Sequence, residues 1–335
     1  MGNPIGWGFI GASTIAREHM VAAVRAAGHE VVAIASGSTE RAQAFAAELG
    51  IAAAYGSVDA LLADPNVQAV YISTTNDQHC AQLLAAAAAG KHVLCEKPLA
   101  LRLEDAERMV AACRDAGVVM ATNHHLRNAA THRKLRELVA EGAIGRPLYA
   151  RVHHAVYLRP VVQGWRIKDA AAGGGAILDI VVHDADALRF VLQSEPVEAI
   201  ALTQTGTLGH AGVEDGVMAV LRLDSGVLAQ VHAAFTVRHA LTGFEIHGER
   251  GSLVARDVMT VRPEGDIVLR DEQGERIVPV AHENLYARGV RCFCDAVRGE
   301  GQPAADGEDG VRSLAVALAV AEAARTGSAV RVAEG

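Results

Sequence analysis

The first third of the chain alternates short apolar runs with helical stretches, and this alternation restricts the fold more than any other feature. The apolar runs are PIGWGFIG, EVVAIAS, AVYIST, KHVLCE and GVVMATN, and helical stretches that begin near residues 14, 39, 77 and 103 separate them. Several of these stretches end in glycine, as helices commonly do. Unbroken apolar strands between helices indicate a parallel sheet that is covered on both faces. We therefore expect a doubly wound α/β domain over residues 1–124.

The pattern changes after a helical segment near residues 124–142. Strand-like runs then follow one another directly, and Asp224-Ser225-Gly226 has the composition of a hairpin turn between two of them. An apolar helix over residues 176–192 interrupts these strands, and helices near residues 283–298 and 308–326 follow them. We expect a second domain over residues 125–335, of the α+β class, with a mostly antiparallel sheet.

Composition excludes several classes of partner. The net charge of −8, from 31 basic and 39 acidic residues, argues against a nucleic-acid surface. The longest apolar stretch, AQLLAAAAAG, is too short to span a membrane. The chain has five cysteines, an odd number with no CxxC pair, and no basic-then-apolar leader at its start. We therefore expect a soluble, cytoplasmic protein with free thiols.

The turn after the first apolar run resembles a dinucleotide-binding fingerprint. It has the form Gly11-x-Ser13-x-x-Ala16, with serine in place of the second glycine. The first glycine provides the tight bend, the hydroxyl of Ser13 is able to hydrogen-bond a phosphate, and a helix that begins near Thr14 directs free N–H groups at the anion. The alternative is a strand–helix turn with no ligand. The Gly11–Ala16 turn lies in the first βαβ unit, and this position favours the dinucleotide site and therefore a Rossmann domain.

The end of the second apolar run indicates which dinucleotide binds. Enzymes that prefer NAD place Asp or Glu there to hold the ribose 2′-hydroxyl, whereas this chain has Ser36. Serine is able to donate a hydrogen bond to a 2′-phosphate, and Arg41, in the first turn of the next helix, is able to pair with it. The alternative for Arg41 is a solvated helix residue. The pattern favours NADP(H).

Candidate catalytic residues lie in two regions. Lys97 follows the KHVLCE run and precedes Pro98, which restricts its backbone. Asp179 and His183, four residues apart on one face of the apolar helix, follow Gly173-Gly174-Gly175. A histidine on such a helix is often a core residue, and Asp-x-x-x-His also occurs in metal sites. No third ligand at close spacing accompanies this pair, so we expect no metal site.

Together, GFIGASTIA, CEKP and the GGG…Asp179-x-x-x-His183 block resemble the glucose–fructose oxidoreductase and inositol dehydrogenase family of nicotinamide-dependent sugar oxidoreductases. The resemblance implies an N-terminal Rossmann domain, a second domain with a large open sheet, and NADPH-dependent reduction of a sugar-derived ketone. It implies cofactor contacts from Gly11, Ala12, Ser13, Thr14, Ile15, Ser36, Gly37, Arg41, Thr74, Thr75, Asn76, His79, Glu96, Lys97 and Asn123. It adds Trp165, Arg166 and Tyr286 from the second domain, although core packing is the alternative for Trp165 and Tyr286. His124, His125, His153 and His154 are candidates either for the sugar pocket or for structural roles.

Within this resemblance, Lys97 would polarise the carbonyl and His183 would donate the proton, because imidazole titrates near neutral pH. Asp179 would orient the substrate hydroxyls or Lys97. The residues do not settle which of Lys97 and His183 delivers the proton. Two other functions remain open: a dehydrogenase of another sugar or cyclitol, and a non-catalytic sensor of NADP or sugar. The open sheet also leaves two alternatives, a solvated face and pairing with a second copy as a homo-oligomer.

Overall fold

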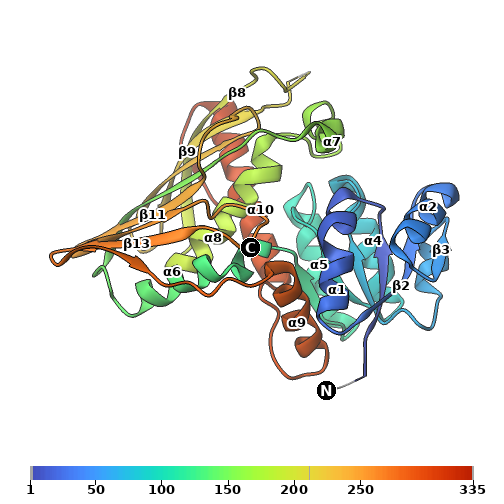
Figure 1. Ribbon diagram of the computed structural model, residues 1–335. Coiled ribbons are helices and arrows are strands. Elements are labelled where there is room, and N and C mark those ends of the chain that lie inside the picture. Colours follow the sequence, from blue (N-terminus) through green and yellow to red (C-terminus); the bar gives the residue numbers. More distant parts are fainter. Residues whose placement is uncertain (1–2, 211, 334–335) are drawn as a thin grey trace. The chain divides into compact units, whose positions relative to one another are not determined.

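The computed structural model describes residues 3–210 and 212–333, which form two compact units (Figure 1). The first unit contains the chain up to His124 and, in addition, Tyr286–Val311; the second contains His125–Leu285 and the chain from Arg312 onward. The first division between the units falls after residue 124. The predicted second domain is nevertheless interrupted, because residues 286–311 pack within the first unit.

The first unit is built on a six-stranded sheet of order β3-β2-β1-β4-β5-β6, in which all pairs of neighbouring strands are parallel. The strands are β1 (Gly6–Ile10), β2 (Glu30–Ala35), β3 (Ala53–Tyr55), β4 (Ala69–Ile72), β5 (His92–Cys95) and β6 (Met120–Thr122). The order reverses between β1 and β4, which is where open α/β sheets bind ligands beyond the carboxyl ends of their strands. The predicted doubly wound Rossmann domain is confirmed.

Helices connect these strands and cover the sheet. They are η1 (Ala16–Met20, a π-helical segment), α1 (Val21–Ala26), α2 (Thr39–Leu49), α3 (Val58–Leu62), η2 (Asn76–Gln78), α4 (His79–Ala88), α5 (Leu103–Asp115) and α9 (Leu285–Val297). The last of these comes from the returning segment. Trp7 of β1 is fully buried, and its ring lies 5.1 Å from that of Phe293 in α9, between centroids. This aromatic contact explains why the segment belongs to the first unit although it is remote in sequence.

The second unit contains a nine-stranded sheet of order β14-β13-β12-β11-β7-β10-β9-β8-β15. The strands are β7 (Pro147–Ala155), β8 (Pro196–Gln204), β9 (Gly216–Leu223), β10 (Leu228–Ala234), β11 (Gly243–Gly248), β12 (Gly251–Arg256), β13 (Asp266–Asp271), β14 (Gly274–Val278) and β15 (Val330–Arg331). β7 and β10 run parallel, and the other neighbouring pairs are antiparallel. The predicted large, mostly antiparallel sheet is therefore confirmed, and β9 and β10 form the predicted hairpin.

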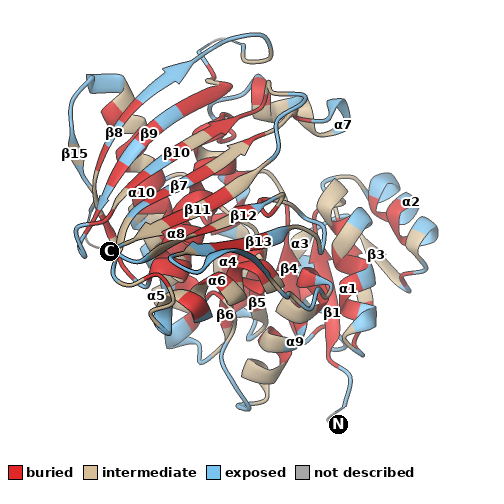
Figure 2. Ribbon diagram, turned by 60° about the vertical axis from the view of Figure 1, so that its left-hand side comes forward, coloured by how far each residue is buried: buried red, intermediate tan, exposed pale blue. Residues whose placement is uncertain are grey.

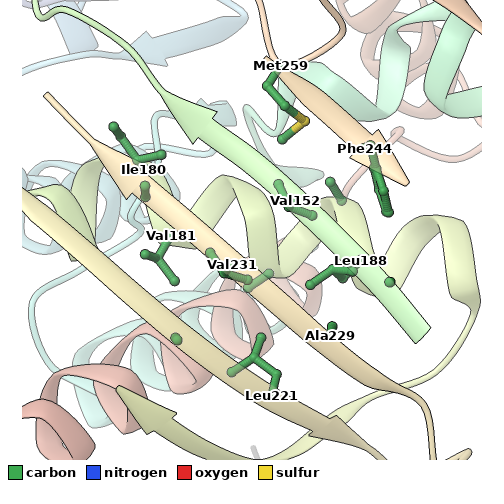
Figure 3. Close-up of a cluster of buried hydrophobic side chains, with 14 of the residues drawn as sticks. Val152, Ile180, Val181, Leu188, Leu221, Ala229, Val231, Phe244 and Met259 are labelled. Atoms are coloured by element: carbon green, nitrogen blue, oxygen red, sulfur yellow. The ribbon is translucent and has the colours of Figure 1, made fainter. Parts of the chain in front are cut away.

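One face of this sheet packs against helices. The helices of this unit are η3 (His125–Asn128), α6 (Ala130–Ala140), α7 (Pro160–Gln163), η4 (Gly164–Ile167), η5 (Ile177–Val181), α8 (Val182–Leu192) and α10 (Gly307–Thr326), the first turn of which lies in the other unit. Figure 3 shows Val152, Val231 and Leu221 of the sheet over Ile180 and Leu188 of the helices.

The opposite face is exposed within this unit. Buried and exposed residues alternate along β8 and β9 (Figure 2). The exposed positions include the large apolar residues Ile200, Leu202, Met218 and Val220. This alternation is expected of a sheet that buries one face only.

All five cysteines are free thiols. Burial raises the pKa of Cys113 to about 11 and that of Cys294 to about 12, and it raises the pKa of Cys95 well above its usual range. Thiolates are the reactive form, so these three side chains are chemically inert near neutral pH. In the described part of the chain, no helix combines the length and apolar character that crossing a membrane requires.

His132, in α6, makes the stability of the second unit depend on pH. The side chain is fully buried, and burial lowers its pKa from 6.5 to about 3. Between these two pH values the unfolded chain binds more protons than the folded one, so the stability due to neutral His132 is present above pH 6.5 and is lost as the pH falls toward 3. We expect this group to lower the free energy of unfolding by about 2 kcal/mol between pH 7 and pH 5.

Denaturant unfolding of the unmodified protein and of His132→Leu at both pH values measures this contribution. The variant should lose about 2 kcal/mol of the pH dependence. Other buried histidines, such as His79, act in the same direction in both proteins and cancel in the difference. An identical pH dependence in the two proteins would contradict the assignment.

Candidate active site

The turn after β1 has the geometry of a phosphate-binding turn. Gly11 has a φ of +107°, and a Cβ there would lie 2.9 Å from the carbonyl oxygen of Ser73, so only glycine fits. The helix begins at Thr14. The backbone N–H groups of Thr14 and Ile15 lie in its first turn, where no carbonyl group of the helix is able to accept their hydrogen bonds. They are therefore available to an anion beside Ala12.

Ser13 has a structural role that its place in the fingerprint did not reveal. Its hydroxyl accepts a hydrogen bond from the N–H of Ala16 at 3.1 Å and donates one to the Oγ of Ser73 at 2.8 Å. The side chain therefore caps the helix and ties this turn to the end of β4. The predicted hydrogen bond from this hydroxyl to a phosphate would compete with the bond to Ser73.

The end of β2 carries Ser36 and Arg41, which were predicted to select NADP(H), and Gly37, a predicted cofactor contact. Ser36 directly follows β2, and no carboxylate occupies this position. α2 begins one turn later, where Ser38 caps it by accepting a hydrogen bond from the N–H of Arg41 at 3.3 Å. The guanidinium of Arg41 reaches back over Gly37, with its Nη2 3.9 Å from the point where a Cβ would lie. Ser36, Gly37 and Arg41 therefore lie close together after β2.

The segment after β4 holds the next predicted set, Thr74, Thr75, Asn76 and His79. The hydroxyl of Thr74 donates to the Oε1 of Gln82 at 2.7 Å, and that of Thr75 accepts from the Nε2 of Gln78 at 2.8 Å. Asn76 is buried in the short η2 helix.

His79 is fully buried, and its Nδ1 lies 2.9 Å from the carbonyl oxygen of Pro98. Burial lowers the pKa of His79. It links α4 to the segment that carries Lys97, so it supports that segment from within the core.

Glu96 lies at the centre of a polar cluster at the ends of β4, β5 and β6. Its Oε1 accepts hydrogen bonds of 2.6 Å from the hydroxyl of Tyr71 and of 2.6 Å from the Nδ2 of Asn123. Its Oε2 accepts a 3.4 Å bond from the backbone N–H of Lys97. Glu96 therefore fixes the backbone from which the side chain of Lys97 extends, and the Lys97–Pro98 bond that follows is cis.

Tyr286 lies in the first unit, not in the second as predicted. It is buried, its ring stacks on His19 with centroids 4.9 Å apart, and burial together with Glu96 raises its pKa well above the usual range. The prediction was wrong about the unit because residues 286–311 return to the first sheet. Tyr286 thus lies on the cofactor-binding unit itself.

The predicted residues of the second unit are Asp179, His183, Trp165 and Arg166. Asp179 lies in the π-helical segment η5, and His183 lies in the first turn of α8. The Nε of Arg166 donates to the Oδ1 of Asp179 at 3.3 Å, and the guanidinium of Arg166 lies 4.6 Å from the ring centroid of Trp165. Asp179, Arg166 and Trp165 are therefore connected by direct contacts within this unit.

His183 belongs to a group of histidines in the same unit. Its ring meets that of His125 edge-on, with centroids 4.7 Å apart, and lies 6.3 Å from that of His154. The Nδ1 of His154 lies 2.7 Å from the Oδ1 of Asp184, a fully buried carboxylate whose pKa burial raises. Asp184 therefore orients His154 toward this group.

The neighbouring His153 does not join this group. Consecutive residues of a strand face opposite sides of the sheet, so His153 projects to the exposed face, where its ring packs on His232. It was a candidate for the sugar pocket, and the structure excludes it from the group around His183. His124 is buried in the first unit, where its backbone N–H donates to the backbone carbonyl of Thr122.

Sequence reasoning missed Tyr71, Ser73 and Asp184. Tyr71 could have been identified from the sequence, because a tyrosine in a buried strand needs a hydrogen-bond partner for its hydroxyl. Nothing in the sequence indicated the roles of Ser73 and Asp184, since their partners are remote in sequence. Among the described residues, no group of three or more His, Cys, Asp or Glu side chains is arranged to hold a metal ion.

Comparison with known proteins covers both units. The model of the oxidoreductase family with an NAD-binding Rossmann fold matches residues 5–124, and the GFO/IDH/MocA C-terminal domain matches residues 132–254. A 1,5-anhydro-D-fructose reductase of Ensifer adhaerens is 57% identical over 329 residues, which cover 98% of this chain and 99% of that protein.

Solved structures with the same fold include two sugar oxidoreductases. The aldose–aldose oxidoreductase of Caulobacter crescentus superposes with a TM-score of 0.89 at 26% identity, over 98% of this chain and 100% of that one. A levoglucosan dehydrogenase in complex with NADH and levoglucosan has a TM-score of 0.89 at 25% identity, over 99% and 100% of the two chains.

Proposed function

This chain belongs to the GFO/IDH/MocA family of oxidoreductases, and we propose that it uses NADPH to reduce 1,5-anhydro-D-fructose to 1,5-anhydro-D-mannitol. The observation that carries the proposal is the 57% identity, over nearly the whole of both chains, to a 1,5-anhydro-D-fructose reductase. The fold alone would not choose among the many reactions that Rossmann oxidoreductases perform. Membership of an oxidoreductase family also favours an enzyme over a non-catalytic sensor.

The end of β2 supports NADPH as the cofactor. A carboxylate at this position would repel a 2′-phosphate, and Ser36 stands there instead. Arg41, folded back over Gly37, offers a guanidinium that is able to form charge-assisted hydrogen bonds with the phosphate oxygens. The first N–H groups of the helix, at Thr14 and Ile15, would hold the pyrophosphate, because they carry partial positive charge and have no acceptor within the helix.

The remaining site residues support reduction of a carbonyl. A bound nicotinamide supplies the hydride. Lys97, whose backbone Glu96 holds, hydrogen-bonds the carbonyl oxygen and stabilises the negative charge that develops on it. His183 donates the proton to that oxygen. Asp179 is held by Arg166 and accepts hydrogen bonds from the sugar hydroxyls, which orients the ring.

Incubation of the purified protein with a panel of ketoses and anhydroketoses tests the function. The loss of absorbance at the nicotinamide band should be fastest with 1,5-anhydro-D-fructose and NADPH, and much slower with NADH. The reverse assay, with sugars, cyclitols and NADP⁺ or NAD⁺, is the comparison arm. Efficient oxidation of a cyclitol or aldose, without reduction of 1,5-anhydro-D-fructose, would replace the proposal by a dehydrogenase function.

A further inference from the structure

The exposed face of the second sheet contains a depression that the proposed reaction does not use. Its volume is about 800 Å³, and the strands that line it are β7, β10, β11, β12 and β13, together with residues 240–242. Arg151 and His153 project into it, whereas Val152 and His154, which alternate with them along β7, face the helices on the other side. The depression and the group around His183 therefore lie on opposite faces of one sheet.

A glycine creates this depression. In the strand register, Gly243 of β11 lies between His153 of β7 and Arg256 of β12. Large side chains thus flank a position that has none. His232 of β10 continues the row beyond His153, and the two imidazole rings meet edge-on with centroids 4.8 Å apart. The floor is backbone at Gly243, one wall is a pair of imidazoles, and the other wall is a guanidinium.

The charges around the depression are unequal. Arg151 is neutralised by Glu245 at 2.5 Å, and Arg270 is neutralised by Glu275 at 2.7 Å. Arg256 is exposed and forms no ion pair with any described residue, although Asp266 lies opposite it in the register. Arg256 therefore lines the depression without an ion-pair partner among the described residues. A planar guanidinium presents parallel N–H donors that match the oxygens of a carboxylate or phosphate.

The imidazole wall complements this charge. His153 and His232 are both partly buried, and burial lowers the pKa of each. They are therefore neutral at physiological pH, and each offers one N–H donor as well as an apolar ring edge. This combination suits the body of an organic molecule better than a bare inorganic ion.

We propose that this depression binds a small organic oxyanion, a carboxylate or a phosphate ester, through Arg256, with its body over Gly243 and against His153 and His232. The volume lies in the range that small-molecule sites occupy. The site is independent of the proposed reaction, since none of its residues contributes to either candidate half of the active site.

Isothermal titration with citrate and with glucose 6-phosphate, and with glycerol as the uncharged comparison, tests the site. One of the two anions should bind with a dissociation constant below about 10 mM, and glycerol should not. Binding of citrate would identify the oxyanion as a carboxylate, and binding of glucose 6-phosphate would identify it as a phosphate ester. Binding should weaken at least about tenfold in Arg256→Gln, because a charge-assisted hydrogen bond is lost. Gly243→Val should fill the depression and abolish binding, and its melting temperature shows whether it folds.

Arg262→Gln is the matched control, because Arg262 is an exposed arginine outside the depression that pairs with Glu264. It should bind the anion as the unmodified protein does, and both arginine variants should keep full NADPH oxidation. Absence of binding by either anion, or equal weakening in the two arginine variants, would overturn the proposal. So would cross-linking showing that a second copy covers this face and that added anions do not displace it.

Discussion

Replacing His183 by alanine should lower kcat for sugar reduction by roughly 10²- to 10⁴-fold, the range that a positioned acid contributes. NADPH binding should stay nearly unchanged, because His183 lies in the second unit and the residues proposed to hold the nucleotide phosphates lie in the first. Single-turnover reduction and NADPH titration measure the two quantities separately. Lys97→Ala should reduce kcat by a similar factor through loss of charge stabilisation.

His183 is buried, so its removal also leaves space in the core. His183→Asn, which keeps a hydrogen-bonding side chain, and the melting temperatures of both variants separate lost chemistry from lost stability. His282→Ala replaces an exposed histidine of the same unit and should leave kcat unchanged. A folded His183→Ala protein with near-normal kcat would return His183 to a structural role beside His125.

Replacing Arg41 by glutamine should weaken NADPH binding by about 1.5–3 kcal/mol, roughly 10- to 150-fold, because one charge-assisted contact is lost. NADH has no 2′-phosphate, so its affinity should change little. Ser36→Asp should weaken NADPH by charge repulsion and improve NADH. Fluorescence titration of both nucleotides against the three proteins gives these affinities.

The control for Arg41 is Arg114→Gln, since Arg114 is an exposed arginine of the same unit, at the end of α5. It should not change either affinity. Equal use of NADPH and NADH by the unmodified protein would show that Ser36 and Arg41 do not select the cofactor.

The sequence predicted the elements whose apolar pattern is strong. Five of the six parallel strands of the first unit and the β9–β10 hairpin are examples, because buried strands and tight turns require particular residue types. β3 and β14 escaped prediction. β3 has only three residues, none of them fully buried, and β14 is almost wholly exposed, so neither has the length and burial of a typical strand. Such edge strands are held by the neighbouring strand rather than by their own composition.

The site was predictable where local geometry constrains residue type. Gly11 is fixed by a positive φ, and the carboxylate-free end of β2 can be recognised from Ser36 alone. Partners that are remote in sequence were not predictable. The bond of Ser13 to Ser73, the pairing of Asp179 with Arg166 and the position of Tyr286 in the first unit all depend on how the chain returns in space.

Transfer of deuterium from NADPH that carries deuterium at both C4 positions of the nicotinamide tests the central claim most directly. After incubation with 1,5-anhydro-D-fructose, the reduced sugar is isolated and examined by mass spectrometry and proton NMR. We expect a single deuterium at the former carbonyl carbon of 1,5-anhydro-D-mannitol. The Lys97→Ala protein should form the same labelled product at a much lower rate. Consumption of the labelled NADPH with no deuterium in the sugar, or no reduction of this ketone at all, would contradict the account.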